Sequence, residues 1–309
     1  MTMTKAIRRQ LPPGAAVTRR RFCESFVAAA AIIGPGLSPF AASAAPTLDL
    51  DRHPDLLQAM IKMRGSLDSE LVVGWLRAKR FAVSQGRIEP LCGVLAATFN
   101  NFRQVSEELF DVVTLEITHY TDFQTGALLD RLVMPFVDKE VQVPLYRFGP
   151  VRSRFAVQLD EKEEFAPAAD SNEGEFAPAG SVLMTKSIRA EAIRGGKLFM
   201  RHEEHGRVKP HASAIPTMFY KESTIWSAGL TDVLDTSTRN VDASVSYSAM
   251  TSWRPWMQMG DLPGHTTSNG FGGKAQSPAD LPEDFVRYTQ RQHPDVLKDP
   301  QALLDAFDG

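Results

Sequence analysis

Cysteine and long apolar runs are both scarce in this sequence. Its 309 residues include only two cysteines, Cys23 and Cys92. Cys92 alone remains once the first 44 residues are removed, and a single thiol excludes an intramolecular disulfide, so stability must come from packing. Because Cys92 lies in the apolar run 91–97 without a neighbouring base, it is predicted to be a buried structural thiol and not a nucleophile.

Basic runs are also missing beyond residue 44. That part of the chain has 28 Lys plus Arg against 36 Asp plus Glu, a net charge of −8. An acidic chain without a basic run repels phosphate backbones and anionic lipid surfaces. We therefore expect no nucleic-acid partner and no membrane association of the mature protein.

The first 44 residues have the features of a cleavable export leader. Arg19, Arg20 and Arg21 precede an apolar stretch at 26–33, and a small-x-small cleavage site follows at 42–44. A membrane anchor is the alternative, but a span needs about 20 continuous apolar residues and this stretch is much shorter. The sequence predicts export by the twin-arginine translocase and a periplasmic product, with residues 45–309 as a single domain. It gives no indication of the oligomeric state.

Short alternating runs from residue 71 onward predict an all-β chain. The runs cover 71–83, 88–102, 110–120, 127–133, 137–146, 152–159, 181–193, 197–202, 216–227 and 243–253. Gly195-Gly196 is a hairpin dipeptide suited to positive φ. About nine or ten strands at this spacing favour a single antiparallel β-barrel or barrel-like sheet, lipocalin-like, because closure removes exposed edges.

Helices are predicted to be few and peripheral. They are expected at 53–63, at 230–234, and in a C-terminal helical tail, 280–309, with helices near 282–292 and 300–307. Residues 161–180 are rich in acid, Ala, Pro and Gly. This composition predicts a mobile surface loop, with a domain linker as the alternative.

The densest cluster of aromatic and polar residues lies at 251–265, where Pro255 ends a strand and a loop begins. Such a loop can line the mouth of an apolar pocket. The candidate catalytic residues are Arg254, Asp261 and His265, and the candidate substrate-binding residues are Tyr247, Trp253, Trp256 and Met257. The alternative is a plug in which the tryptophans seal the barrel and Arg254 pairs with Asp261.

Three stretches carry a resemblance to a known family. Residues 62–68 (Lys-Met-Arg-Gly-Ser-Leu-Asp), 125–130 (Thr-Gly-Ala-Leu-Leu-Asp) and 251–265 resemble the domain of unknown function 1838, an uncharacterised bacterial and fungal family. The similarity extends over nearly all of residues 60–305. The resemblance implies a single exported domain and no particular reaction.

His119 is a further catalytic candidate. It ends the row Val113, Leu115 and Ile117 on one strand face. Glu116, Thr118 and Tyr120 lie on the other face. A histidine at the end of an apolar row is more often a hydrogen-bonded core residue. If the row faces a ligand, His119 is instead suited to be a general base near neutral pH, with His265 as a partner.

Two short motifs resemble a metal site and a nucleotide site, but the residues around them do not fit either kind of site. In the string 202–205 (His-Glu-Glu-His), His202 and Glu204 share a strand face but His205 does not, so an exposed hairpin tip is favoured over a metal site. Residues 270–275 match G-x-G-x-x-A, but no strand is predicted before them and no helix after them. We therefore expect neither a metal nor an organic cofactor.

These features favour a periplasmic enzyme that performs acid/base chemistry on an apolar, aromatic or polycyclic small molecule inside the barrel. His119 or His265 would move the proton, and Arg254 would stabilise negative charge. Lyase, isomerase and hydrolase fit equally. The alternatives are a non-catalytic lipocalin-type protein that binds a hydrophobic ligand, and a structural protein with a filled barrel.

The leader generates a direct test. Changing Arg19, Arg20 and Arg21 together to lysine keeps the charge but removes the guanidinium groups, so we expect loss of most periplasmic product. Immunoblots of periplasmic and cytoplasmic fractions measure the distribution. The matched control changes Arg8 and Arg9 to lysine and leaves export intact; equal export of both variants would contradict the twin-arginine assignment.

Overall fold

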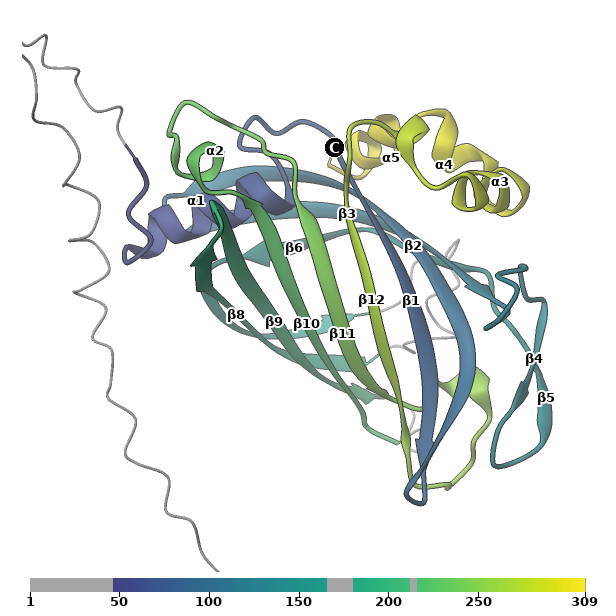
Figure 1. Ribbon diagram of the computed structural model, residues 1–309. Coiled ribbons are helices and arrows are strands. Elements are labelled where there is room, and N and C mark those ends of the chain that lie inside the picture. Colours follow the sequence, from purple (N-terminus) through teal and green to yellow (C-terminus); the bar gives the residue numbers. More distant parts are fainter. Residues whose placement is uncertain (1–46, 166–179, 212–215, 309) are drawn as a thin grey trace, which may run out of the picture. The chain divides into compact units, whose positions relative to one another are not determined.

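The strands dominate the computed structural model, which describes residues 47–165, 180–211 and 216–308 (Figure 1). They are β1 (Val72–Ser84), β2 (Arg87–Ser106), β3 (Leu109–Thr121), β4 (Arg131–Met134), β5 (Lys139–Gln142), β6 (Tyr146–Phe155), β7 (Gln158–Phe165), β8 (Gly180–Arg194), β9 (Lys197–Pro210), β10 (Met218–Gly229), β11 (Ser244–Ser252) and β12 (His265–Ala275). The helices are α1 (His53–Arg64), α2 (Leu230–Leu234), α3 (Glu283–Gln292), α4 (Pro294–Lys298) and α5 (Pro300–Asp308), with 3₁₀ turns η4 (Pro255–Met257) and η5 (Pro278–Asp280). The predicted leader lies outside the described residues.

Ten of these strands form one antiparallel sheet in the order β6-β3-β2-β1-β12-β11-β10-β9-β8-β7. The edge strands β6 and β7 are consecutive in the chain and are joined by Ala156 and Val157. Because these strands lie at opposite ends of the sheet order, the sheet curls back toward its own beginning. The Ile188 N–H of β8 donates to the Val157 carbonyl at 2.8 Å and extends the β7–β8 pairing into this connection. The predicted all-β, barrel-like fold is confirmed.

Tight turns set the register of the long hairpins. Gln85 and Gly86 join β1 to β2 with φ of 51° and 74°, and Gly195 and Gly196 join β8 to β9 with φ of 58° and 72°. Two successive residues with positive φ make the hairpin turn whose twist matches that of the strands. The predicted Gly-Gly hairpin is therefore confirmed.

Helix α1 closes one end of the barrel. Its residues Leu57, Met60, Ile61 and Met63 are fully buried. They share an apolar cluster with side chains that face inward from the strand ends; these include Phe102, Phe110, Phe155, Met200, Trp226 and Val245. The predicted helix at 53–63 is confirmed, and its contacts make it a plug for this end of the barrel.

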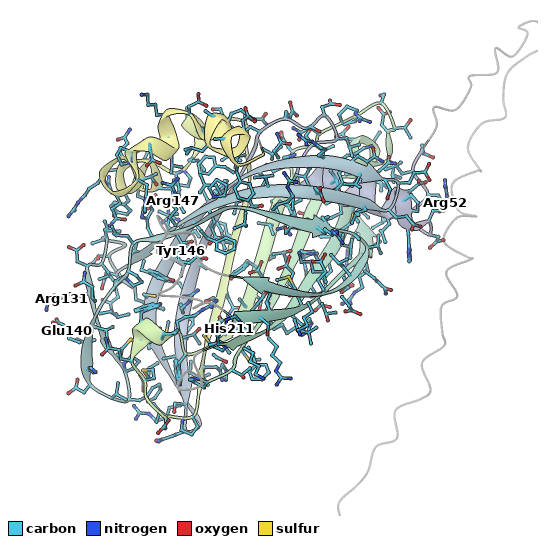
Figure 2. The ribbon with its side chains drawn as sticks, turned by 180° about the vertical axis from the view of Figure 1, so that it is seen from behind. Arg52, Arg131, Glu140, Tyr146, Arg147 and His211 are labelled. Carbon is cyan, nitrogen blue, oxygen red and sulfur yellow. The ribbon has the colours of Figure 1, made fainter. Side chains whose placement is uncertain are left out.

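The tail helices cover part of the outer face of the sheet. Phe285, Val296 and Leu304, from α3, α4 and α5, pack on outward-facing residues of β1, β2 and β3. Arg147 of β6 also donates to Asp295 of α4 at 2.7 Å (Figure 2). The outer face beneath the tail is therefore a second apolar core.

The opposite end of the barrel is lined by the loop that follows β11. Trp256, Met257 and Met259 are buried against residues of β1, β2 and β3 and against the β4–β5 hairpin. In that hairpin Arg131 donates to Glu140 at 2.7 Å (Figure 2). This arrangement agrees with the interpretation of the tryptophan loop as a seal.

Several predicted boundaries are wrong. Residues 127–130 are not in a strand, because the run there makes only an isolated bridge between Thr121 and Leu128. Residues 161–165, assigned from composition to a loop, belong to β7, whereas 166–179 lie outside the described residues. The expected hairpin tip at 202–205 lies in the middle of β9, which continues to Pro210.

Strand β12 is missing from the sequence-based prediction, although it lies between β1 and β11. Its three glycines lower strand propensity and conceal the alternation. Two of them are required by close approach: a Cβ on Gly270 would collide with the Arg77 carbonyl, and one on Gly272 with the Trp75 carbonyl. The glycines therefore mark tight packing of β12 on β1.

Among the helices that the structure describes, none has both the length and the apolar character needed to cross a bilayer.

The tail packing generates a stability prediction. Phe285 is fully buried and Phe307 is 46 % exposed. Phe285→Ala removes a full aromatic side chain from the outer core and is expected to lower the free energy of unfolding by about 3–5 kcal/mol, whereas Phe307→Ala costs about 0.5 kcal/mol or less. Urea denaturation followed by circular dichroism measures both; equal effects would contradict the packing of α3 on the sheet.

Candidate functional site

Residues that lie directly opposite one another on neighbouring strands form a row inside the barrel, and this row brings charged side chains together. It crosses six strands in the order Lys186, Glu204, Glu222, Ala249, Ser268 and Arg80. These positions share the inward face with the buried residues two positions away on each strand, such as His202 and Thr224. A third carboxyl, Glu116, faces inward from β3. We call Glu116, Glu204 and Glu222 the interior carboxyl cluster.

Glu204 and Glu222 lie directly opposite one another on β9 and β10. Like charges in such a cross-strand pair destabilise a sheet. Burial, followed by repulsion from Glu204, raises the pKa of Glu222 to about 8. Glu222 is therefore protonated at neutral pH and is held by a hydrogen bond with Tyr247.

Glu204 remains ionised. Burial acts to raise its pKa, but the interaction with His202, followed by the positive charges of Arg64 and Lys186, brings the pKa below its ordinary value. Lys186 occupies the opposite position on β8. The pair therefore holds one proton, on Glu222, and one negative charge, on Glu204.

His202 is neutral and its tautomer is fixed. Arg64 Nη1 lies 2.8 Å from His202 Nδ1, and because a guanidinium has no acceptor, Nδ1 must accept and the proton must lie on Nε2. This Nε2 faces Glu204 Oε1 at 3.5 Å. Burial, opposed by Glu204, lowers the His202 pKa to about 3.

Arg64 reaches the cluster from the last residue of α1. The end of that helix is fixed by two lysines. Lys274 donates from β12 to the carbonyls of Lys62 and Gly65, at 3.1 and 2.7 Å. The fully buried Lys62 donates to the carbonyls of Val233 and Asp235, at 2.9 and 2.6 Å. Burial lowers the pKa of both lysines, that of Lys274 to about 8.

Glu116 completes the cluster from β3. Burial raises its pKa, against the lowering effects of a hydrogen bond from Thr118 and of the charges of Arg254, Arg80 and Arg64. Thr118 Oγ1 donates to Glu116 Oε1 at 2.8 Å. The positive charge of Arg254 therefore acts on a carboxyl inside the barrel.

Small side chains face this cluster from the neighbouring strands. Ala249, Ser268 and Gly270 occupy successive inward positions of β11 and β12. The side chain of Glu204 is still 19 % exposed, and those of Glu116 and Glu222 are half-buried. The interior around the carboxyls is therefore not packed solid.

Tyrosines and an indole border the same region. Tyr220 lies one inward position from Glu222, and its ring occupies the space where a side chain on Gly206 would be. Burial raises the pKa values of Tyr220 and Tyr247. The Tyr120 ring lies 5.4 Å from the Trp256 ring. Tyr220 and Tyr247 therefore place aromatic rings beside the carboxyls, whereas Tyr120 and Trp256 are buried in the seal.

The structure places His119 away from this cluster. Its row faces outward beneath the tail helices, where His119 Nδ1 lies 2.9 Å from Gln292 Oε1 and Nε2 lies 2.8 Å from Thr289 Oγ1. Burial lowers its pKa to about 4. This arrangement matches the interpretation of His119 as a hydrogen-bonded core residue.

The other predicted site residues lie in three places: the interior, the seal at the end of the barrel, which includes Trp253, and the exposed surface. Tyr247 and Arg254 act in the interior, whereas Trp256 and Met257 are buried in the seal at the end of the barrel. Trp253 Nε1 donates to the Leu262 carbonyl at 2.9 Å. Asp261 lies in an exposed turn, and His265 begins β12 facing outward. The structure does not bring His119, His265 and Asp261 together.

The histidine string in β9 follows strand alternation. His202 and Glu204 face inward, and His205 is exposed on the outer face. The string therefore cannot supply one ligand set from both faces. Within the described ranges, no group of three or more His, Cys, Asp or Glu side chains is arranged to hold a metal ion.

Sequence reasoning missed the interior carboxyl cluster because it took the apolar row of β3 as the face toward the ligand. The sequence did contain a signal. Glu116, Glu204 and Glu222 each lie within a strand, and the residues on either side of each one face outward, so alternation places the glutamate itself on the inner face. The sequence of β3 alone does not say which of its two faces points inward. The structure decides this, because the tail helices cover the apolar face.

The proton on Glu222 predicts a pH dependence of stability. A carboxyl whose pKa is about 8 in the folded chain and about 4.3 in the unfolded chain stabilises the fold at low pH, and that stability is lost between these two values as pH rises. Glu222→Gln is therefore expected to flatten the fall in unfolding free energy between about pH 5 and about pH 9.

Urea denaturation across this range measures the effect. Glu203→Gln is the matched control, since Glu203 is next to Glu204 but faces outward, where it pairs with Arg189 at 3.1 Å. A Glu222→Gln variant with the wild-type pH dependence would contradict the raised pKa.

Comparison with known proteins supports family membership for the C-terminal part of the chain. No curated protein matches it. Residues 209–308 match the model of the family described as "Protein of unknown function (DUF1838)". The matched region includes the 251–265 motif but not the motifs at 62–68 and 125–130. The resemblance to the DUF1838 family is thereby confirmed over residues 209–308; its extension to residues 60–208 stays a prediction.

Proposed function

We propose that this protein is an exported periplasmic enzyme that performs acid/base chemistry on a small molecule inside the barrel. The observation that carries the proposal is the opposed pair Glu204 and Glu222, whose pKa values shift in opposite directions. Pairs of carboxyls separated in this way divide the roles of acid and base at one pH. The export aspect rests on the leader at 1–44.

In this proposal Glu222 is the general acid and Glu204 the general base. Glu204 takes a proton from the substrate, and the Glu222 carboxyl delivers its own proton to another substrate atom. The pair holds one proton before and after this exchange, so a proton transfer between the two carboxyls restores the starting state. Isomerisation and elimination need only such a transfer, and hydrolysis uses the same groups with water.

The neighbouring cations favour a substrate on which negative charge develops. Arg64, Arg80 and Arg254 all act on Glu116, and Lys186 lies opposite Glu204. Fixed positive groups in a site shielded from water stabilise an enolate or oxyanion strongly. The basis for the aromatic or polycyclic part of the substrate is the pair of tyrosine rings, Tyr220 and Tyr247, beside the carboxyls.

The alternative is a lipocalin-type binding protein. The observation that favours it is the presence of the Tyr220 and Tyr247 rings in the interior, since aromatic rings inside a barrel bind an apolar ligand without chemistry. The two functions differ in the fate of the ligand, because an enzyme converts it and a binding protein returns it unchanged.

The test uses variants that trap substrate. Wild-type protein, Glu204→Gln and Glu222→Gln are purified after export, and copurifying small molecules are identified by mass spectrometry. We expect a compound enriched in the variants that the wild type converts to a product. Removing either carboxyl should lower kcat about 10²- to 10⁴-fold, because it deletes one proton-transfer step.

Glu203→Gln is again the matched control and is expected to keep wild-type turnover. Tight binding of an unchanged compound by the wild type after long incubation would favour the binding protein. Full turnover by both interior variants would eliminate the acid/base assignment.

A further inference from the structure

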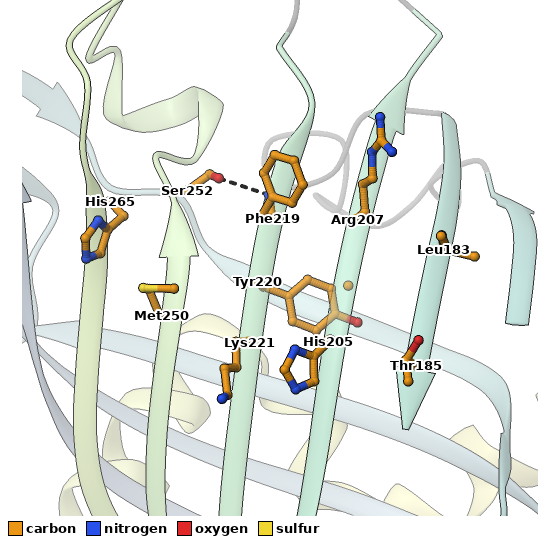
Figure 3. Close-up of a pocket in the computed structure, with 11 residues that line it drawn as sticks. Leu183, Thr185, His205, Arg207, Phe219, Tyr220, Lys221, Met250, Ser252 and His265 are labelled. Atoms are coloured by element: carbon orange, nitrogen blue, oxygen red, sulfur yellow. Dashed lines mark hydrogen bonds between the residues drawn. The ribbon is translucent and has the colours of Figure 1, made fainter. Parts of the chain in front are cut away.

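A groove of about 420 Å³ lies on the outer side of the barrel wall formed by β8 to β12 (Figure 3). Its most exposed apolar side chains are Leu183, Phe219 and Met250, which are 49, 56 and 48 % exposed, and Tyr220 also lines it. Three large apolar side chains on three different strands thus gather at one place on the surface. Its volume lies within the range of small-molecule sites, about 300–1,000 Å³.

The polar lining of this groove is cationic or neutral. It includes Arg207 and Lys221, together with the imidazoles of His205 and His265. Among the described residues that line it, none is an aspartate or glutamate. This is unexpected for a chain with a net charge of −3, and it makes the groove complementary to an anion.

We infer that this groove binds a small amphipathic anion, in which an aromatic or aliphatic body carries a carboxylate or sulfonate group. Phe219, Met250 and Leu183 would contact the body of the ligand. Lys221 and Arg207 would pair with the anionic group.

Lys221 can reorient toward such a ligand. Its Nζ lies 3.9 Å from Glu203 Oε1, a longer contact than the 3.1 Å pair between Glu203 and Arg189. A hydroxyl donor adds to the site, because Ser252 Oγ accepts from the Phe219 N–H at 2.9 Å and its own hydrogen remains for another acceptor.

The charged side chains of the groove lie on the opposite strand face from the interior carboxyl cluster, although Tyr220 and Gly206, at inward positions, also line the groove. His205 and Lys221 face outward, whereas their chain neighbours Glu204 and Glu222 face inward. Alternation along β9 and β10 places the backbone between the two sites. The inference therefore does not depend on the proposed reaction.

Two fluorescent probes that differ in charge test the inference. 8-Anilinonaphthalene-1-sulfonate is an aromatic anion, and N-phenyl-1-naphthylamine has the same rings without the sulfonate. Phe219→Ala is expected to raise the Kd of both probes about fivefold or more. Lys221→Gln combined with Arg207→Gln is expected to raise the Kd of the sulfonate about tenfold and leave that of the neutral probe within about twofold.

Matched controls come from the same surface. Phe271 is 60 % exposed on β12 but does not line the groove, and Lys197 is an exposed lysine at the start of β9. Phe271→Ala and Lys197→Gln should keep wild-type affinities. Circular dichroism confirms that each variant is folded.

Three results would overturn the inference. Unchanged sulfonate affinity in the groove variants would place the probe elsewhere. Equal weakening of both probes by the charge variants would remove the anion specificity. A dimer in sedimentation velocity that Phe219→Ala dissociates would assign the groove to a second copy of the chain.

Discussion

The opposed position of Glu204 and Glu222 is the constraint on which the interior of this barrel depends. Their contact is fixed by the register of β9 and β10, and a slip of one residue would turn both side chains to the outside. A bare pair of carboxylates there would destabilise the sheet. The fold retains the pair because Lys186 occupies the next position in the row and because Glu222 holds a proton.

The two faces of the strands have different tasks, and β3 shows this division. Val113, Leu115 and Ile117 face outward into the apolar core beneath α3 to α5, and they supply stability. Glu116 and Thr118 face inward and are joined by a hydrogen bond. In β3 the apolar row therefore marks the helix-covered outside, and the row that contains the charged residue marks the interior.

The sequence was sufficient for the barrel but not for its interior. Alternation and turn dipeptides such as Gly195-Gly196 are local, and they predicted most strands. The glycines of β12 serve contacts with Trp75 and Arg77 on another strand, so local propensity was misleading there. The carboxyl cluster depends on register across β8, β9 and β10 and on a helix before β1, which no local pattern contains. The tryptophan loop was recognised, and its structure supports the role of a seal more than that of a mouth.

The plug helix links the stability of one end of the barrel to the protonation of its interior. Cations are favourable at a helix C-terminus, where carbonyls lack partners, and Lys274 binds two carbonyls at the end of α1. With that end fixed, Arg64 is held against His202 Nδ1, which places the imidazole proton on Nε2, toward Glu204. A change at α1 would therefore alter which groups in the interior carry protons, even though its apolar residues lie in a different cluster from the carboxyls.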